Sequence, residues 1–140
     1  KQKINKIPHE DFDFIIIDTP PYLFEEIHSL VQQADLIVIP TQASINDLLA
    51  IDKTVQIIKD NNAVDRSLIV FNRIKANSSL KERLSDNFNE LDVPIANTVI
   101  NDYDAITNSI VTKGVEGKHK ASNQLQNLTR ELMIKLLSNG

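Results

Sequence analysis

The stretch that decides the fold is Phe-Ile-Ile-Ile-Asp-Thr-Pro-Pro at residues 14–21. Four bulky apolar residues in a row predict a strand buried on both faces, as in a parallel sheet covered by helices. The run ends at Asp18, and strands of such sheets carry their chemistry at their carboxyl ends. Pro20 and Pro21 lack backbone donors and fix φ, so we expect the strand to stop and a defined loop to follow. A buried strand that simply ends in a polar turn explains the same residues.

Apolar runs of strand length alternate along the chain with segments whose apolar residues recur at helical spacing. This alternation predicts an α/β fold, a doubly wound and mainly parallel sheet with helices on both faces, in a single domain over residues 1–140. The predicted strands lie at 14–18, 36–40, 67–72 and 94–100, and the predicted helices at 25–33, 46–59, 79–91, 102–111 and 122–137.

The run at 14–18 carries no charge and no proline until it ends, so it lacks the features that protect the edge of a sheet. We therefore expect it to have a neighbour on both sides, with at least one partner strand missing from this chain. The alternative is that helices cover both faces and a local strand supplies the second edge.

Two predicted helices have well-defined inward faces. Asn46 or Asp47 is expected to cap the first of them, and a helix of this kind buries one apolar stripe against the sheet. The expected inward residues are Leu48, Ile51, Val55 and Ile58 in the first helix and Leu125, Leu128, Leu132, Met133 and Leu136 in the second.

The composition is that of an ordinary globular protein, with 41% hydrophobic and 24% charged residues. The net charge of −4 gives no overall basic character, so a nucleic-acid contact would have to come from a local patch. The absence of cysteine excludes disulfides, thiolate metal sites and a cysteine nucleophile. The longest apolar runs are of strand length, which predicts a cytoplasmic protein without a membrane-spanning helix.

Three predicted strands end in polar residues that a parallel sheet brings to one edge: Asp18-Thr19, Pro40-Thr41 and Asn72-Arg73. A side-chain amide offers donors and an acceptor, so Asn72 can pair with the edge of a purine base. The guanidinium of Arg73 can stack against the ring. The alternative for Asn72 is a turn residue after a strand.

In this order and at these intervals, the motifs resemble the ParA/MinD family of deviant P-loop ATPases, and above all the small plasmid-partition ParA proteins. The resemblance covers nearly the whole chain, but only about the carboxyl-terminal two-thirds of a family member. The matching segments are Asp13–Pro21 (acidic strand and switch loop), Ala34–Thr41 (the next strand), Ser44 and Asp47 (a Ser-x-x-Asp pattern), Val70–Arg73 (the adenine side) and Pro94–Leu137 (the closing strand and helices).

The resemblance implies a catalytic and binding apparatus for ATP. Asp18 would hold Mg²⁺ through its water shell, Thr19, Pro20 and Pro21 would respond to the γ-phosphate, and Asn72 with Arg73 would contact adenine. ATP would drive a dimer that binds DNA without sequence preference, and a ParB-like centromere-binding protein would stimulate hydrolysis. Such a protein works in the bacterial cytoplasm at the nucleoid.

The chain departs from the family at its phosphate loop. Its three glycines are Gly114, Gly117 and Gly140, so no glycine loop precedes Asp18. The segment 113–119 has lysines and glycines at similar spacing, but it follows a helix and lacks the hydroxyl that binds magnesium. We therefore expect a carboxyl-terminal portion that binds neither ATP nor Mg²⁺ alone.

Three lysines form a local basic patch late in the chain, Lys113, Lys118 and Lys120. They are candidates for contacts with DNA phosphates, or an ordinary solvated loop. Two other functions stay open: a truncated ParA-like partner-binding module without nucleotide activity, and a MinD-like ATPase of the division site. The last helix is expected to pack on the core, which argues against membrane contact.

Overall fold

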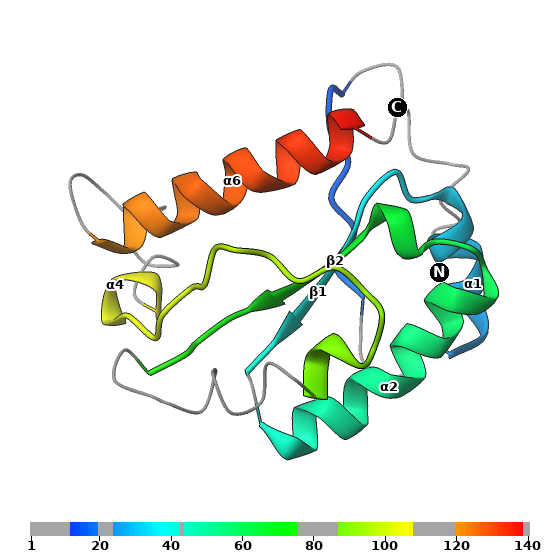
Figure 1. Ribbon diagram of the computed structural model, residues 1–140. Coiled ribbons are helices and arrows are strands. Elements are labelled where there is room, and N and C mark those ends of the chain that lie inside the picture. Colours follow the sequence, from blue (N-terminus) through cyan, green and yellow to red (C-terminus); the bar gives the residue numbers. More distant parts are fainter. Residues whose placement is uncertain (1–11, 20–23, 43, 76–86, 108–119, 139–140) are drawn as a thin grey trace.

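The computed structural model describes residues 12–19, 24–42, 44–75, 87–107 and 120–138, and every structural statement below concerns these residues. The chain forms a small mixed α/β fold in which two central strands are flanked by helices (Figure 1). Its elements are α1 (Phe24–Gln33), β1 (Ile37–Thr41), α2 (Ile45–Asp60), the 3-10 turn η3 (Val64–Arg66), β2 (Ser67–Phe71), α4 (Asp104–Thr107) and α6 (Lys120–Ser138).

The two strands form a parallel pair connected through α2. Ile37 lies opposite Ser67 at one end of the pair, and Thr41 lies opposite Phe71 at the other. Parallel neighbours need a crossover connection, which the helix provides, so β1, α2 and β2 make one βαβ unit. The fold is therefore α/β with parallel strands, as the sequence predicts, although the described sheet has two strands rather than a full doubly wound set.

The extended chain at 94–101 runs along the other side of β2. Backbone hydrogen bonds of 2.8 Å join Ile69 to both Pro94 and Ala96, and a second parallel bridge forms at Ile74. Within the described residues, β2 thus lies between β1 and this segment, and all five of its residues are buried.

The predicted strand at 94–100 forms only isolated bridges, because its backbone donors have other partners in the middle. The N–H groups of Asn97 and Thr98 donate to the carboxylate of Glu131 in α6. A strand ladder cannot continue through residues whose donors are taken up by a side chain, so the pairing breaks there.

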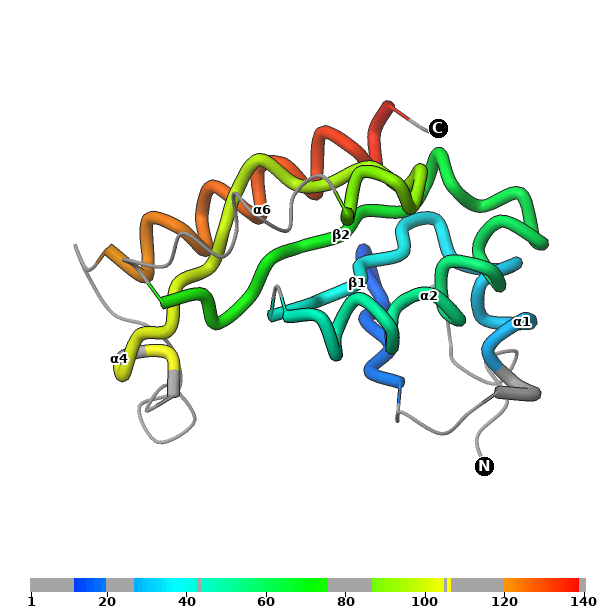
Figure 2. Tube along the Cα trace, turned by 60° about the horizontal axis from the view of Figure 1, so that its bottom comes forward, coloured from blue at the N-terminus to red at the C-terminus, as the bar shows by residue number. Residues whose placement is uncertain are grey.

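Side chains of β2 alternate between two helical layers. Ile69 and Phe71 belong to the core cluster that contains Ile51, Val55 and Ile58 of α2. The side chains on the opposite face of β2 pack against α6. They form a second cluster, which consists of Leu68, Val70, Ala96, Leu128 and Leu132. Figures 1 and 2 show the same layering, with α1 and α2 on one side of the strands and α6 on the other.

The prediction of a buried strand at 14–18 is wrong for this structure. Residues 12–19 are described, but they form no strand, and Ile16 is 94% exposed. Figures 1 and 2 show this segment crossing beside β1 without joining the sheet. A strand is stabilised by hydrogen bonds to its neighbours, and no described residue offers such a partner to these backbone groups.

The helices follow the sequence pattern in part: Leu128 and Leu132 of α6 pack against the core as expected, whereas Leu125, Met133 and Leu136, expected on the same face, belong to neither core cluster of the described residues. In α2 the expected inward residues are buried or packed against the core, which confirms that face. The cap differs, because Ser44 rather than Asn46 or Asp47 caps α2. The expected helix at 79–91 lies mainly outside the described residues; of the one expected at 102–111, the described part forms α4 at Asp104–Thr107 and residues 108–111 lie outside.

Candidate functional site

The carboxyl ends of β1 and β2 lie side by side and form the only part of the predicted site that the described residues assemble. The backbone N–H of Asn72 donates to the carbonyl oxygen of Thr41 at 2.8 Å. We call Thr41, Asn72, Arg73 and Asp102 the carboxyl edge. In parallel α/β sheets, ligands bind at this end of the strands, so this edge is the candidate for a binding site.

The side chain of Asn72 is partly committed to its own backbone. Its Oδ1 accepts a hydrogen bond of 3.0 Å from the N–H of Arg73. Within the described residues, no hydrogen bond uses the side-chain NH₂ or the second lone pair of Oδ1. Asn72 is thus oriented by the chain itself before any ligand arrives, and it can still offer a donor to a base.

Arg73 holds a backbone conformation that its residue type rarely adopts. Its φ is 55°, in the left-handed region, whereas the other non-glycine residues with positive φ in the described part of the chain are Asn62 and Asp92. Asn and Asp tolerate this region well, but a long side chain there is uncommon. The guanidinium is exposed, and its Nε lies 3.6 Å from Oδ1 of Asp102. The bend therefore presents a solvent-accessible cation directly beside Asn72.

Sequence reasoning missed a chain of amide contacts that supports this bend. The carbonyl oxygen of Ile74 accepts hydrogen bonds from the N–H of Asp102 at 3.1 Å and from Nδ2 of Asn101 at 2.9 Å. Asn101 in turn pairs with Gln124 of α6. The signal was the polar Asn101-Asp102 pair directly after the apolar run that ends at Ile100.

The acidic part of the predicted site is separate from the carboxyl edge. Asp18 and Thr19 are exposed at the end of the extended segment, and no hydrogen bond or ion pair within the described residues joins them to Asn72 or Arg73. Pro20 and Pro21 lie outside the described residues. No group of three acidic or histidine side chains in the described part of the chain could hold a metal, so Asp18 would need water or phosphate oxygens as the other ligands of Mg²⁺.

The Ser-x-x-Asp pattern has a structural explanation in the helix cap. Oγ of Ser44 accepts from the N–H of Asp47 at 3.1 Å and donates to its carboxylate. This arrangement satisfies donors at the start of α2 and places a negative charge near the positive end of the helix dipole. Nearby, the buried hydroxyl of Thr41 has no hydrogen-bond partner within the described residues.

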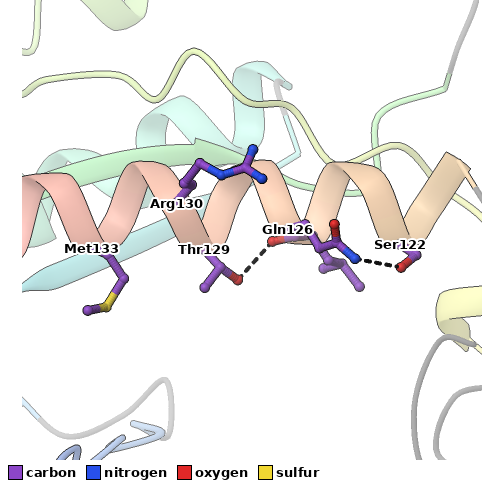
Figure 3. A pocket seen from close by; sticks show the side chains of 6 residues that line it. Ser122, Gln126, Thr129, Arg130 and Met133 are labelled. Carbon is purple, nitrogen blue, oxygen red and sulfur yellow. Dashed lines mark hydrogen bonds between the residues drawn. The ribbon is translucent and has the colours of Figure 1, made fainter.

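A shallow groove of about 460 Å³ runs along α6, and all of its lining residues belong to that helix. Figure 3 shows Ser122, Thr129 and Met133 pointing to one side of α6. None of the lining residues was predicted as part of the site. Of the predicted basic patch, Lys120 is described and exposed, whereas Lys113 and Lys118 lie outside the described residues.

Glu131 is the one described group whose acidity clearly changes. Partial burial raises the pKa of its carboxyl, but hydrogen bonds from the backbone N–H groups of Asn97 and Thr98 and from the Thr98 side chain outweigh this and lower it. The two backbone bonds measure 2.7 and 2.9 Å. Hydrogen bonds to an ionised carboxylate are the stronger kind, so Glu131 anchors α6 to the 94–101 segment.

No protein-family model matches the chain, and a search of curated proteins found no match. Across the described ranges, no helix is long and apolar enough to cross a membrane.

Proposed function

We propose that the chain is part of a ParA-like ATPase of plasmid or chromosome partitioning. In this proposal ATP and Mg²⁺ bind the intact protein, ATP drives two subunits together, and the dimer holds DNA without sequence preference. A ParB-like partner stimulates hydrolysis and release at the nucleoid. The ordered set of motifs supports the family, and the parallel strands with helices on both faces are compatible with it.

The observation that carries the proposal is the bend at Asn72 and Arg73. A non-glycine residue in the left-handed region costs of the order of 1–3 kcal/mol, and such residues concentrate at ligand sites. Here the strained residue is a cation at the carboxyl end of the central described strand, beside an amide already fixed by the backbone. An amide and a planar cation suit the edge and the face of a purine.

The exposed run that precedes Asp18 fits an incomplete nucleotide site. Phosphoryl transfer needs a cradle of backbone N–H groups around the phosphates, and this sequence has no glycine before residue 114 to form one. We therefore assign the phosphate loop to a further segment of the protein, packed beside residues 14–18. With that segment in place, Asp18 would face Mg²⁺ from its strand end.

Calorimetric titration with ATP and Mg²⁺ tests the proposal. The chain alone should show no binding, and the chain joined to a segment that carries the phosphate loop should bind. In the joined protein, Asn72→Ala and Asp18→Asn should each weaken binding, while Asp13→Asn, at another exposed carboxylate of the same segment, should not. If neither the chain alone nor the joined protein binds ATP, the proposal that this protein binds a nucleotide is wrong.

DNA binding has a separate test. Reversing charge in Lys118→Glu with Lys120→Glu should weaken retention of the joined protein on non-specific DNA, and the loss should be largest at low salt. Lys53→Glu with Arg130→Glu, at exposed basic residues of α2 and α6, reverses the same number of charges and is the matched control. Equal retention by all three proteins at low salt would remove the patch from the proposal.

One observation favours a second candidate, a ParA-like partner-binding module without nucleotide activity. The apolar side chains of residues 12–17 are largely exposed, with Phe12 and Phe14 at 60% and 58%, and such a patch can serve a protein partner. Binding of ATP by the joined protein would reject this candidate.

A further inference from the structure

Helix α6 is connected to the carboxyl edge by one reciprocal pair of amides, Gln124 and Asn101. Oε1 of Gln124 accepts the backbone N–H of Asn101 at 2.9 Å, and Nε2 of Gln124 donates to Oδ1 of Asn101. The remaining amide donor of Asn101, Nδ2, reaches the carbonyl oxygen of Ile74 at 2.9 Å. The side chain of Asn101 therefore bridges α6 and the chain that leaves β2.

The backbone of Ile74 is held on both sides by this arrangement. Its N–H donates to Ile100 at 3.1 Å, and its carbonyl oxygen accepts from both Asp102 and Asn101. Ile74 follows directly after the left-handed residue Arg73, and its side chain is buried. A strained conformation persists only where its surroundings over-determine it, and these bonds supply that constraint.

We infer that Gln124 and Asn101 are positioning residues that keep residues 72–74 in the conformation a ligand meets. That these residues matter for binding a base rests on the function proposed above. That they keep residues 72–74 in their observed conformation does not depend on that function. Neither side chain needs to touch the ligand. Without the Gln124 amide, the N–H and Oδ1 of half-buried Asn101 lose their partners, and Asn101 turns toward water and releases the Ile74 carbonyl.

The structure also provides a control that separates positioning from simple docking of α6. Glu131 anchors the same helix to the same 94–101 segment, but through Asn97 and Thr98, which make no hydrogen bond to residues 72–74 within the described part of the chain. Loss of the Glu131 carboxylate should loosen α6 as a whole. Loss of the Gln124 amide should act on residues 72–74.

Amide hydrogen exchange measured by nuclear magnetic resonance on the chain itself tests the inference. After correction for each variant's change in the free energy of global unfolding, we expect Gln124→Met to speed exchange at Ile74 and Asp102 about tenfold over wild type, as the loss of buried partners implies, with about threefold or less in Glu131→Gln. Gln124→Glu keeps the acceptor for the Asn101 N–H and serves if the first variant fails to fold. The double variant Asn101→Gln with Gln124→Asn, in which the two amide side chains trade places, should recover part of the protection against hydrogen exchange that Gln124→Met loses.

Equal exchange at Ile74 and Asp102 in the Gln124 and Glu131 variants would overturn the positioning role. Adenosine titrated into the joined protein that carries the phosphate loop, and into the same variants of that joined protein, reports on the ligand, with guanosine beside it. Wild type should show shifts at Asn72 and Arg73 that weaken several-fold in Gln124→Met and not in Glu131→Gln. If wild type shows no shift with adenosine while exchange responds as expected, the base-binding proposal fails and the hold on the bend stands.

Discussion

At the scale of single residues, Glu131 shows how one carboxylate can determine both packing and pairing. Its two oxygens take the N–H groups of Asn97 and Thr98, which fixes α6 in place and interrupts the pairing of the 94–101 segment with β2. In the unfolded chain the same oxygens would be hydrated. Their contribution to stability is therefore the difference between hydrogen bonds to water and charge-assisted hydrogen bonds to these two N–H groups at a half-buried position.

The first prediction concerns this carboxylate. Glu131→Gln keeps one acceptor but turns an NH₂ group toward a backbone donor, so the free energy of unfolding should fall by about 1–2 kcal/mol. Urea denaturation followed by circular dichroism measures the change. Glu90→Gln, at an exposed carboxylate, is the control and should be within about 0.5 kcal/mol of wild type. A loss no larger than that of the control would contradict the anchor.

The lowered pKa of Glu131 gives a second prediction, on pH. A carboxyl group that is more acidic in the folded chain contributes stability above its unfolded pKa and loses it as pH falls through the folded pKa. The difference in unfolding free energy between wild type and Glu131→Gln should therefore shrink as pH falls from about 6 to about 3. A difference that stays constant over this range would show that the bonds do not depend on the charge.

At the scale of elements, the helices α1, α2 and α6 and the strands β1 and β2 could be predicted from the sequence, whereas the strands expected at 14–18 and 94–100 could not. The stripe in α2 follows the helical period, and burial of Ile51, Val55 and Ile58 is set by that period alone. For α6 the period identified Leu128 and Leu132 correctly, and these two pack under the helix. Helix patterns are local, so a single segment contains most of the information.

Strands depend on neighbours that lie far away in sequence. The run at 14–18 has the apolar character of a buried strand, but no described segment pairs with it, and it stays exposed. The middle of the segment at 94–100 does not pair with β2, because its N–H groups donate to the carboxylate of Glu131, which lies at least 33 residues away along the chain. The polar Asn101-Asp102 pair was a signal for Asn101, but its partner Gln124 lies 23 residues away along the chain, so the amide pair could not be predicted for the same reason.

The cap of α2 gives a third prediction. Because Ser44 accepts from the N–H of Asp47, Ser44→Ala should lower the free energy of unfolding by about 1 kcal/mol. Asn46→Ala, two positions later and inside the helix, should change it by less than about 0.5 kcal/mol. The denaturant midpoints of the two variants give the comparison. A larger loss of stability in Asn46→Ala than in Ser44→Ala would show that the cap suggested by the sequence alone is the correct one.

At the scale of the whole molecule, the apolar segment beside the sheet should control association. Phe12, Phe14, Ile16 and Ile17 are all largely exposed, and surfaces of this kind favour contacts between copies. The fourth prediction is that Ile16→Lys lowers the average mass measured by sedimentation at high protein concentration and leaves the unfolding midpoint nearly unchanged. Lys53→Ile makes the opposite change, from a cation to an apolar side chain, at an exposed site of α2 outside this segment, and serves as the control. An unchanged mass in Ile16→Lys would exclude this segment from the contact.

The two-sided burial of β2 also has a consequence for how the protein is made. Leu68 and Val70 are covered by α6, whereas the opposite face of β2 is covered by α2, which the ribosome has already completed. At roughly 5–20 residues per second, the last residue of α6 is synthesised roughly 3–13 s after the last residue of β2. Once Phe88 and Val93 have completed the α2 side, and until α6 follows, the nascent chain carries one covered and one bare side of the same strand, and the bare side is where a chaperone has time to bind.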